Sequence, residues 1–275
     1  MSGFVLVLDT ATERTAVGVA RLKGSTPTLI ASAMVDAPRA AMSRLLPTAA
    51  SLLDQVDAPV SDVTDVVVGR GPGSFTGVRI GVATAKGLSH GLGVPLWGVG
   101  TLDAVAWGVA AQRAGEPPFT LAVAGDAMRG EIYPALFRCA GGRAARVAPD
   151  KVAKPEVVIA EWSAFGEPLV LAGNGLRKYT EVLLGGLSAD VTVTEEELWA
   201  PTAQGLLAAW VAARDTGEPG SGDLADVLPV YTRLSDAEEN ERARAGLDPR
   251  MTPQSGVAGG QTPALRPDTL GRDER

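Results

Sequence analysis

The sequence is poor in the residues from which many catalytic and metal sites are built. Its 275 residues include one cysteine, Cys139, and one histidine, His90. No intrachain disulfide can form, which fits a reducing compartment, and neither a multi-cysteine nor a multi-histidine zinc site can be assembled. A Ser-His-Asp or Cys-His catalytic site would have to use His90. Because His90 lies near the expected end of a helix and Cys139 within an expected strand, we interpret both as structural.

Long apolar runs and dense basic runs are also missing. No stretch of about 18 uncharged apolar residues occurs, so we expect no membrane span. The first nine residues resemble a strand that ends at an acid rather than a signal peptide, and we expect a cytoplasmic protein. With 25 basic and 32 acidic residues, the chain has a net charge of −7. It is therefore a poor candidate for binding nucleic acid unaided, and a partner would hold any RNA substrate.

The chain contains two similar halves. Apolar residues make up 45% of it, enough for a sizeable core, and its 33 glycines and 19 prolines favour many short elements. An apolar strand that ends at an aspartate, followed by a turn and a second strand, occurs twice, with Asp9 and Asp126 in matching places. We expect a duplicated α/β chain with a first lobe at 1–114 and a second at 115–234. The tail at 235–275 has no aromatic residue, and we expect it to be disordered.

The spacing of apolar residues predicts where the other helices and strands lie. Helical spacing indicates a helix that begins near Arg44 or Leu45, because Pro47 fits only its first turns. Thr101 is expected to cap a later helix. Further helices are predicted near 74–89, 101–113, 176–184 and 202–214. Strands are predicted at 4–8, 15–20, 29–35, 66–68, 94–98, 119–126, 131–138, 143–147, 169–172 and 191–194.

The glycine-rich segment 69–81 is the most distinctive stretch of the chain. It joins a strand to a helix through a Gly-Pro-Gly turn, and Ser74 or Thr76 can cap that helix. Free backbone N–H groups at a helix start favour an anion. The spacing matches neither a Walker A motif nor a Gly-x-Gly-x-x-Gly fingerprint. A tight turn that simply needs glycine conformations is the alternative interpretation.

The helix after this loop carries small residues on one face. Gly77, Gly81 and Ala85 are four residues apart and allow another element to approach closely. Interior glycines cost about 1 kcal/mol each relative to alanine, which a packing contact could offset. That contact could lie inside the subunit or between subunits, and we expect the latter.

The paired aspartates resemble those with which actin-like ATPases frame phosphates. Segments 9–12 and 126–129 match those loops, and 171–175 matches the adenosine loop. However, Met128 and Arg129 are bulky where a phosphate loop favours glycine, so we do not expect a complete ATP clamp. The fold class expected is α/β, a two-lobed actin-like ATPase (ribonuclease H-like) fold with a degraded second lobe. The candidate nucleotide or anion loop comprises Asp9, Thr10, Thr12, Gly71, Gly73, Ser74 and Thr76.

Four stretches together resemble the TsaB (YeaZ) family, which acts in threonylcarbamoyladenosine biosynthesis on tRNA. They are 8–12, 69–81, 126–133 and 229–233, and the resemblance extends from about residue 3 to 234. It implies a non-catalytic scaffold or activating subunit without catalytic or metal-binding residues. The partner would be a TsaD-like homologue that transfers threonylcarbamoyl to adenosine 37 of tRNAs reading codons that start with A. A TsaE-like ATPase would join the pair, and tRNA would bind through the complex.

The resemblance also implies where partners bind. Family dimers pack through two helices of the first lobe, and a homodimer is expected when the chain is alone. ATP or ADP is expected, if at all, only at interfaces with partners. Ala41 stands where many relatives have a histidine, and the metal-binding histidine pair of the catalytic homologue is absent. The expected interface residues are Arg44, Leu45, Ala49, Leu52, Gly77, Gly81 and Ala85.

Two other functions stay open from the residues alone. An autonomous actin-like ATPase or small-molecule kinase would turn over ATP as an isolated chain. A glycoprotease-like peptidase would need a nucleophile with a base, or a metal with an open position. The single histidine and the bulky second aspartate loop argue against both.

Overall fold

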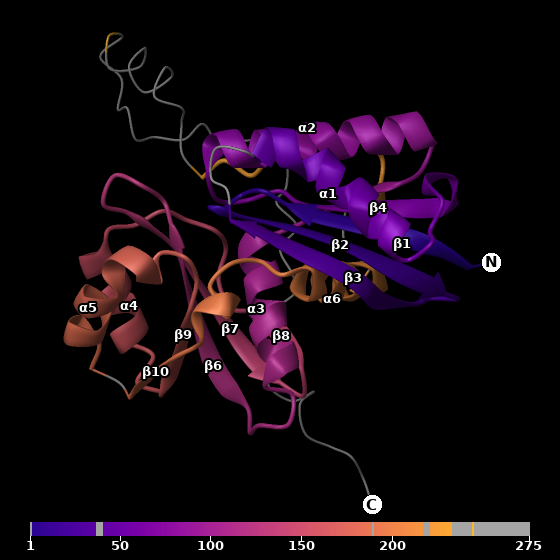
Figure 1. Cartoon of the computed structure of the whole chain (residues 1–275). Helices are drawn as coiled ribbons and strands as arrows, with labels where there is room; N and C mark the ends of the chain where they lie inside the picture. The colour runs from indigo at the N-terminus through magenta and orange to yellow at the C-terminus, as the bar shows by residue number, and fades with distance from the viewer. Residues whose placement is uncertain (1, 37–40, 189, 217–220, 233–243, 245–275) are drawn as a thin grey trace, which may run out of the picture.

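The computed structural model describes residues 2–36, 41–188, 190–216, 221–232 and 244. It contains two mixed sheets (Figure 1). The first sheet has the order β11-β5-β4-β1-β2-β3, formed by Ser221–Gly222, Leu96–Val99, Val63–Gly69, Ser2–Asp9, Arg14–Lys23 and Thr26–Asp36. The second has the order β10-β9-β6-β7-β8, formed by Val191–Val193, Leu169–Ala172, Phe119–Asp126, Ile132–Ala140 and Arg143–Arg146.

The two sheets share one topology. In each, the opening strand pairs antiparallel with the next strand, which pairs antiparallel with a third. The opening strand also pairs parallel with the fourth strand, and the fourth pairs parallel with the fifth. The duplication confirms the predicted two-lobed α/β fold. Asp9 and Asp126 each end the opening strand of their sheet.

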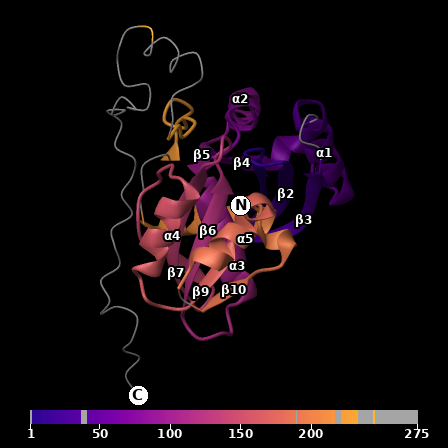
Figure 2. The same ribbon diagram turned by 90° about the vertical axis from the view of Figure 1, so that its left-hand side faces the viewer.

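Within the described residues, six helices cover the sheets in layers. They are α1 (Ala41–Gln55), α2 (Phe75–Leu92), α3 (Thr101–Gln112), α4 (Pro155–Ser163), α5 (Leu176–Gly186) and α6 (Ala203–Thr216). Helices α1 and α2 cover one face of the first sheet, and α6 covers the other. Helix α3 packs against α6 and the second sheet, while α4 and α5 cover the far face of that sheet. Figure 2 shows α1 and α2 apart from α4 and α5.

The expected strands and helices are found, with three differences. Helix α4, the short strand β11 and the short 3₁₀ turns η1 (Val60–Asp62) and η2 (Glu196–Leu198) had no counterpart in the prediction. Helix α1 begins at Ala41, earlier than expected, and holds an exposed Pro47 within it. Thr101 does not cap α3, because the N-cap is Gly100 and makes no side-chain bond.

The chain returns to the first sheet after leaving it. Residues 115–118 form the turn between α3 and β6, where the chain passes to the second sheet. Helix α6 then packs against β1, β2, β3 and β5, and β11 pairs with β5. Residues 203–216 and 221–222, which we assigned to the second lobe, therefore lie on the first sheet, because the apolar side of α6 is buried there and β11 pairs with β5. The predicted tail lies outside the described residues, apart from Arg244.

Candidate functional site

Asp9 is buried at the end of β1, and its carboxylate has specific partners. The residue is 0% exposed. Its Oδ1 accepts a hydrogen bond from the Ala11 N–H at 2.6 Å, and its Oδ2 accepts one from the Thr101 hydroxyl at 2.7 Å. Burial raises the pKa of the carboxyl to about 6, and the two hydrogen bonds limit that rise. Gly69 packs so closely that a Cβ there would lie 1.7 Å from Oδ2.

Thr101 connects Asp9 to the glycine-rich loop. Its hydroxyl accepts a hydrogen bond from the Gly71 N–H at 3.0 Å while it donates to Asp9. The Thr101 N–H in turn donates to the Gly71 carbonyl at 2.9 Å. The start of α3, the loop and Asp9 therefore form one hydrogen-bonded unit. Sequence reasoning gave Thr101 a local role, and nothing in the sequence indicates its contact with Asp9.

The small-residue face of α2 packs inside the subunit, which corrects the expectation that it meets a partner. Gly77, Gly81 and Ala85 are buried. A Cβ at Gly77 would lie 2.1 Å from the Thr10 carbonyl oxygen, and one at Gly81 would lie 2.5 Å from Thr10 Oγ1. Thr10 Oγ1 also donates to the Gly77 carbonyl at 2.6 Å. The glycines are needed because the turn after β1 lies against the helix.

The expected interface residues of α1 are mostly core residues as well. Leu45, Ala49 and Leu52 are between 1% and 6% exposed and belong to the core on the first sheet. Of the α1 residues proposed, only Arg44 is exposed. The helical spacing that identified these residues marks the face that covers the subunit's own sheet.

The candidate anion loop is divided between the interior and a small cavity. Asp9, Thr10 and Gly71 are buried, and Ser74 caps α2 by accepting from the Gly77 N–H at 3.3 Å. Thr76 is exposed in the first turn of α2.

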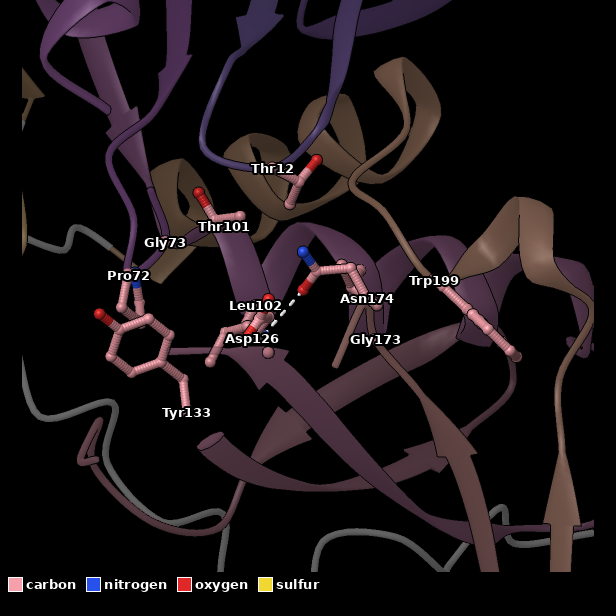
Figure 3. A pocket seen from close by; sticks show the side chains of 12 residues that line it. Thr12, Pro72, Gly73, Thr101, Leu102, Asp126, Tyr133, Gly173, Asn174 and Trp199 are labelled. Carbon is pink, nitrogen blue, oxygen red and sulfur yellow. Dashed lines mark hydrogen bonds between the residues drawn. The ribbon is translucent and has the colours of Figure 1, made fainter. Parts of the chain in front are cut away.

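Thr12 and Gly73 line a cavity between the two lobes, opposite Asp126 and Asn174 (Figure 3). The cavity volume is about 10 Å³, roughly the space that one water molecule needs.

Asp126, the second of the paired aspartates, is held by a lysine. Its Oδ2 lies 2.5 Å from the Lys178 Nζ, and its Oδ1 accepts from the Met128 N–H at 2.9 Å. The hydrogen bond to Asp126 raises the pKa of Lys178. Met128 and Arg129 have φ angles of 62° and 50°, a left-handed backbone that non-glycine residues seldom adopt. Because of Lys178, the Asp126 carboxylate already has a cationic partner.

One contact that sequence reasoning missed joins the lobes across the cavity. Glu13, in the turn between β1 and β2, accepts from Asn174 Nδ2 at 2.8 Å and from Arg177 Nε at 3.1 Å. Asn174 Oδ1 accepts in turn from the Asp126 N–H at 3.0 Å. Glu13 and Asn174 are 161 positions apart, so no local pattern indicates the pair. The contact links the turn after β1 to Asn174, which lines the cavity from the second lobe.

The described part of the chain has neither a cluster of metal-binding side chains nor a helix suited to span a membrane. No group of three or more His, Cys, Asp or Glu side chains there could hold a metal ion. No helix among those residues is long and apolar enough to cross a membrane. Cys139, the single cysteine, is buried in β7, and burial raises the pKa of its thiol to about 12.

Comparisons with known proteins place the chain among tRNA-modification proteins. A family model described as TsaD, tRNA N6-adenosine threonylcarbamoyltransferase, matches residues 35–196. The chain is 31% identical to the tRNA threonylcarbamoyladenosine biosynthesis protein TsaB of Escherichia coli, over 83% of this chain and 94% of that protein. It is 27% identical to TsaB of Bacillus subtilis, over 85% of this chain and 96% of that protein.

A solved structure supports the same grouping. YeaZ from Pseudomonas aeruginosa superimposes with a TM-score of 0.67 at 30% sequence identity, covering 83% of this chain and 99% of that one. Sequence and structure thus agree over almost the whole length of these relatives. The chain belongs to the TsaB (YeaZ) family, within the wider group of proteins that the TsaD model describes.

Proposed function

We propose that this chain is a subunit of the machinery that installs threonylcarbamoyladenosine on tRNA, and that it is not the catalytic subunit. The observation that carries the proposal is the match to TsaB over 94% of the length of that protein at 31% identity. The match of residues 35–196 to a TsaD model supports pairing with a TsaD-like homologue, since related subunits commonly associate through equivalent surfaces.

The state of the two aspartates supports a non-catalytic role. Asp9 is buried and hydrogen-bonded to Ala11 and Thr101, so its carboxylate is used within the fold. Asp126 is paired with Lys178, so its charge is already balanced within the fold. The cavity that Asp126 lines between the lobes measures about 10 Å³, roughly the space of one water molecule. Catalysis would therefore belong to the TsaD-like partner, with a TsaE-like ATPase as a further component and tRNA held by the complex.

Reconstitution tests this proposal. The purified chain, a TsaD-like subunit and a TsaE-like ATPase are combined with tRNA and a threonylcarbamoyl donor, and modified adenosine is measured by mass spectrometry of the digested tRNA. Modification should require this chain together with the TsaD-like subunit and should be absent with this chain alone. Efficient modification without the chain would contradict its place in the complex.

A matched variant tests the non-catalytic part separately. Asp126→Asn removes the charge paired with Lys178 and keeps the size of the side chain. The reconstituted complex should retain most of its activity, because the carboxylate takes no part in the reaction. A folded Asp126→Asn chain that pairs normally and lowers the rate more than about 100-fold would show that Asp126 acts in catalysis.

A further inference from the structure

Arg70, the second residue of the glycine-rich segment, is held by contacts of its main chain and of its side chain. Its N–H donates to the Val99 carbonyl at 2.9 Å, and its own carbonyl accepts from the Val230 N–H at 2.7 Å. Its side chain passes over Gly98, where a Cβ would lie 3.1 Å from Arg70 Cδ and 3.1 Å from Val227. Because the stem of this side chain is already packed, the guanidinium would lose little entropy on binding a ligand.

The guanidinium of Arg70 has no partner within the described residues. Its Nε is buried and makes no hydrogen bond there, and no carboxylate in that part of the chain lies within ion-pair distance of it. The residue as a whole is half-buried, so the guanidinium can be reached from solvent. A buried donor without an acceptor is costly, and nearly all such groups in folded proteins are paired. The free Nε therefore points to an acceptor that the chain itself does not supply.

The carboxylates nearest to Arg70 in charge effect are bound by a different arginine. Arg146 donates to the two oxygens of Asp103 at 2.9 and 2.8 Å, and to Asp150 at 2.9 Å. Burial raises the pKa of Asp150, while Arg146 and, more weakly, Arg70 lower it. Arg70 thus acts on Asp150 only at a distance, and its own donors stay available. The same two carboxylates repel a ligand that carries many negative charges.

A second buried donor without a partner belongs to the segment that is hydrogen-bonded to Arg70. The Thr232 hydroxyl is buried and makes no hydrogen bond within the described residues. It follows by two positions Val230, whose N–H is bonded to the Arg70 carbonyl. Among the described residues, three buried side-chain nitrogen or oxygen atoms lack a partner, and the third is Trp210 Nε1 on α6. Two of the three therefore come from chain segments that are bonded to each other.

We propose that Arg70 and Thr232 form a binding site for a small oxyanion, the carboxylate or phosphate group of a small molecule. Arg70 would hold two of its oxygens side-on, through Nε and a terminal nitrogen, and the Thr232 hydroxyl would donate a further hydrogen bond. A halide offers no second oxygen for the guanidinium edge. An RNA strand finds one arginine here, few compared with the roughly six to ten phosphate contacts of tight binding. This inference goes beyond the function proposed above and does not depend on it.

NMR titration of the full chain with phosphate, and separately with acetate, tests the proposal. Sodium chloride keeps the ionic strength constant. The Arg70 Nε–H signal and the Val230 amide signal should move and saturate, with half-saturation at about 1–10 mM. Arg70→Lys keeps the charge but loses the two-donor edge, so the Val230 signal should report binding at least about 10-fold weaker.

Two further variants complete the experiment. Thr232→Val keeps the shape of the side chain and should weaken binding about 3-fold by loss of one hydrogen bond. It also carries the test if Arg70→Lys does not fold. Arg21→Lys is the matched control, because Arg21 also lacks a carboxylate partner within the described residues but is exposed on β2. This variant should bind both anions as the wild type does.

Each outcome decides for or against the site. Saturation with both anions, or with one of them, supports it, and the anion that binds identifies the group as phosphate or carboxylate. No saturation with either anion up to about 50 mM overturns the proposal. Equal weakening in Arg70→Lys and Arg21→Lys would assign the effect to general charge and overturn it. Unchanged binding in Thr232→Val would overturn the two-donor site.

An internal partner for Arg70 is the remaining alternative. If Asp150→Asn moves the Arg70 Nε–H signal while neither anion does, Arg70 pairs with Asp150 in solution and the proposal is wrong. None of these results bears on pairing with a TsaD-like subunit, since the isolated chain is used throughout.

Discussion

The buried carboxyl of Asp9 makes a quantitative prediction about stability and pH. Its pKa is about 6 in the folded protein, above its ordinary value of 3.8, so the folded state keeps the proton to higher pH than the unfolded state does. Between about pH 4 and pH 6 the folded protein therefore binds more protons, and the free energy of unfolding falls as the pH rises. The contribution of protonated Asp9 is complete below 3.8 and is lost as the pH rises through 6.

The magnitude follows from the size of the pKa difference. At about 1.4 kcal/mol per pKa unit, the interval from 3.8 to about 6 corresponds to about 3 kcal/mol. The asparagine side chain of Asp9→Asn cannot ionise, so this variant does not lose stability through that ionisation as the pH rises. Asparagine keeps an oxygen for the Ala11 N–H, although it disturbs the hydrogen bond with Thr101. Whatever that disturbance costs at pH 4, the stability of the variant relative to wild type should rise by about 2.5 kcal/mol between pH 4 and pH 7.5, because a small part of the effect is already present at pH 4.

Urea denaturation at a series of pH values measures this difference. Other titrating groups are present in both proteins, so their contributions cancel in the comparison. Asp62→Asn, a substitution of an exposed aspartate in η1, supplies the background for loss of one negative charge. A difference between wild type and Asp9→Asn that stays constant from pH 4 to 7.5, after subtraction of that background, would refute the assignment of a raised pKa to Asp9.

Three further predictions concern packing and ion pairs. Gly81→Leu should lower the free energy of unfolding of the isolated chain by at least about 1–3 kcal/mol in urea, because the leucine side chain must displace Thr10. Gly87→Ala on the same helix should instead raise it by about 0.5–1 kcal/mol. Equal effects of the two substitutions would contradict the packing of α2. Arg146→Met should lower the free energy of unfolding by about 3 kcal/mol, since it leaves Asp103 and Asp150 without the guanidinium that contacts them at 2.8 and 2.9 Å. An unchanged midpoint of urea unfolding would disprove the stabilising role of Arg146. Glu13→Gln should change the free energy of unfolding by less than about 1 kcal/mol, because the ion pair with Arg177 is partly exposed. Amide hydrogen exchange near Asn174 should nevertheless become faster. Unchanged exchange would count against Glu13 as a contact that holds the two lobes together.

Much of the fold was predictable because local patterns determine it. Apolar strands that end at Asp9 and Asp126 indicated the duplication, and the two sheets have the same strand order. Ser74 was one of two predicted caps for α2, and its hydroxyl accepts from Gly77 as a cap does. Helix α4 was not predicted. Its buried residues are few, and its apolar side is weakly defined in the sequence. Such short helices depend on the sheet they cover more than on their own periodicity.

The candidate site likewise has features that local patterns determine and features that depend on tertiary packing. The sequence by itself determined that Gly77, Gly81 and Ala85 share one face of a helix, since helical spacing alone decides that. It could not determine what covers the face, and only the tertiary structure placed Thr10 there.

The structure also decided which groups meet across the fold. Thr101 reaches Asp9 from 92 positions away, and Glu13 reaches Asn174 from 161 positions away. Periodicity reports the direction of a side chain relative to its own helix or strand, whereas the partner it meets depends on how distant elements pack. The sequence therefore identified the residues of the glycine loop and both aspartates. The packing of the two lobes decided that Asp9 is buried, that Asp126 is paired with Lys178, and that only a small cavity stays between the lobes.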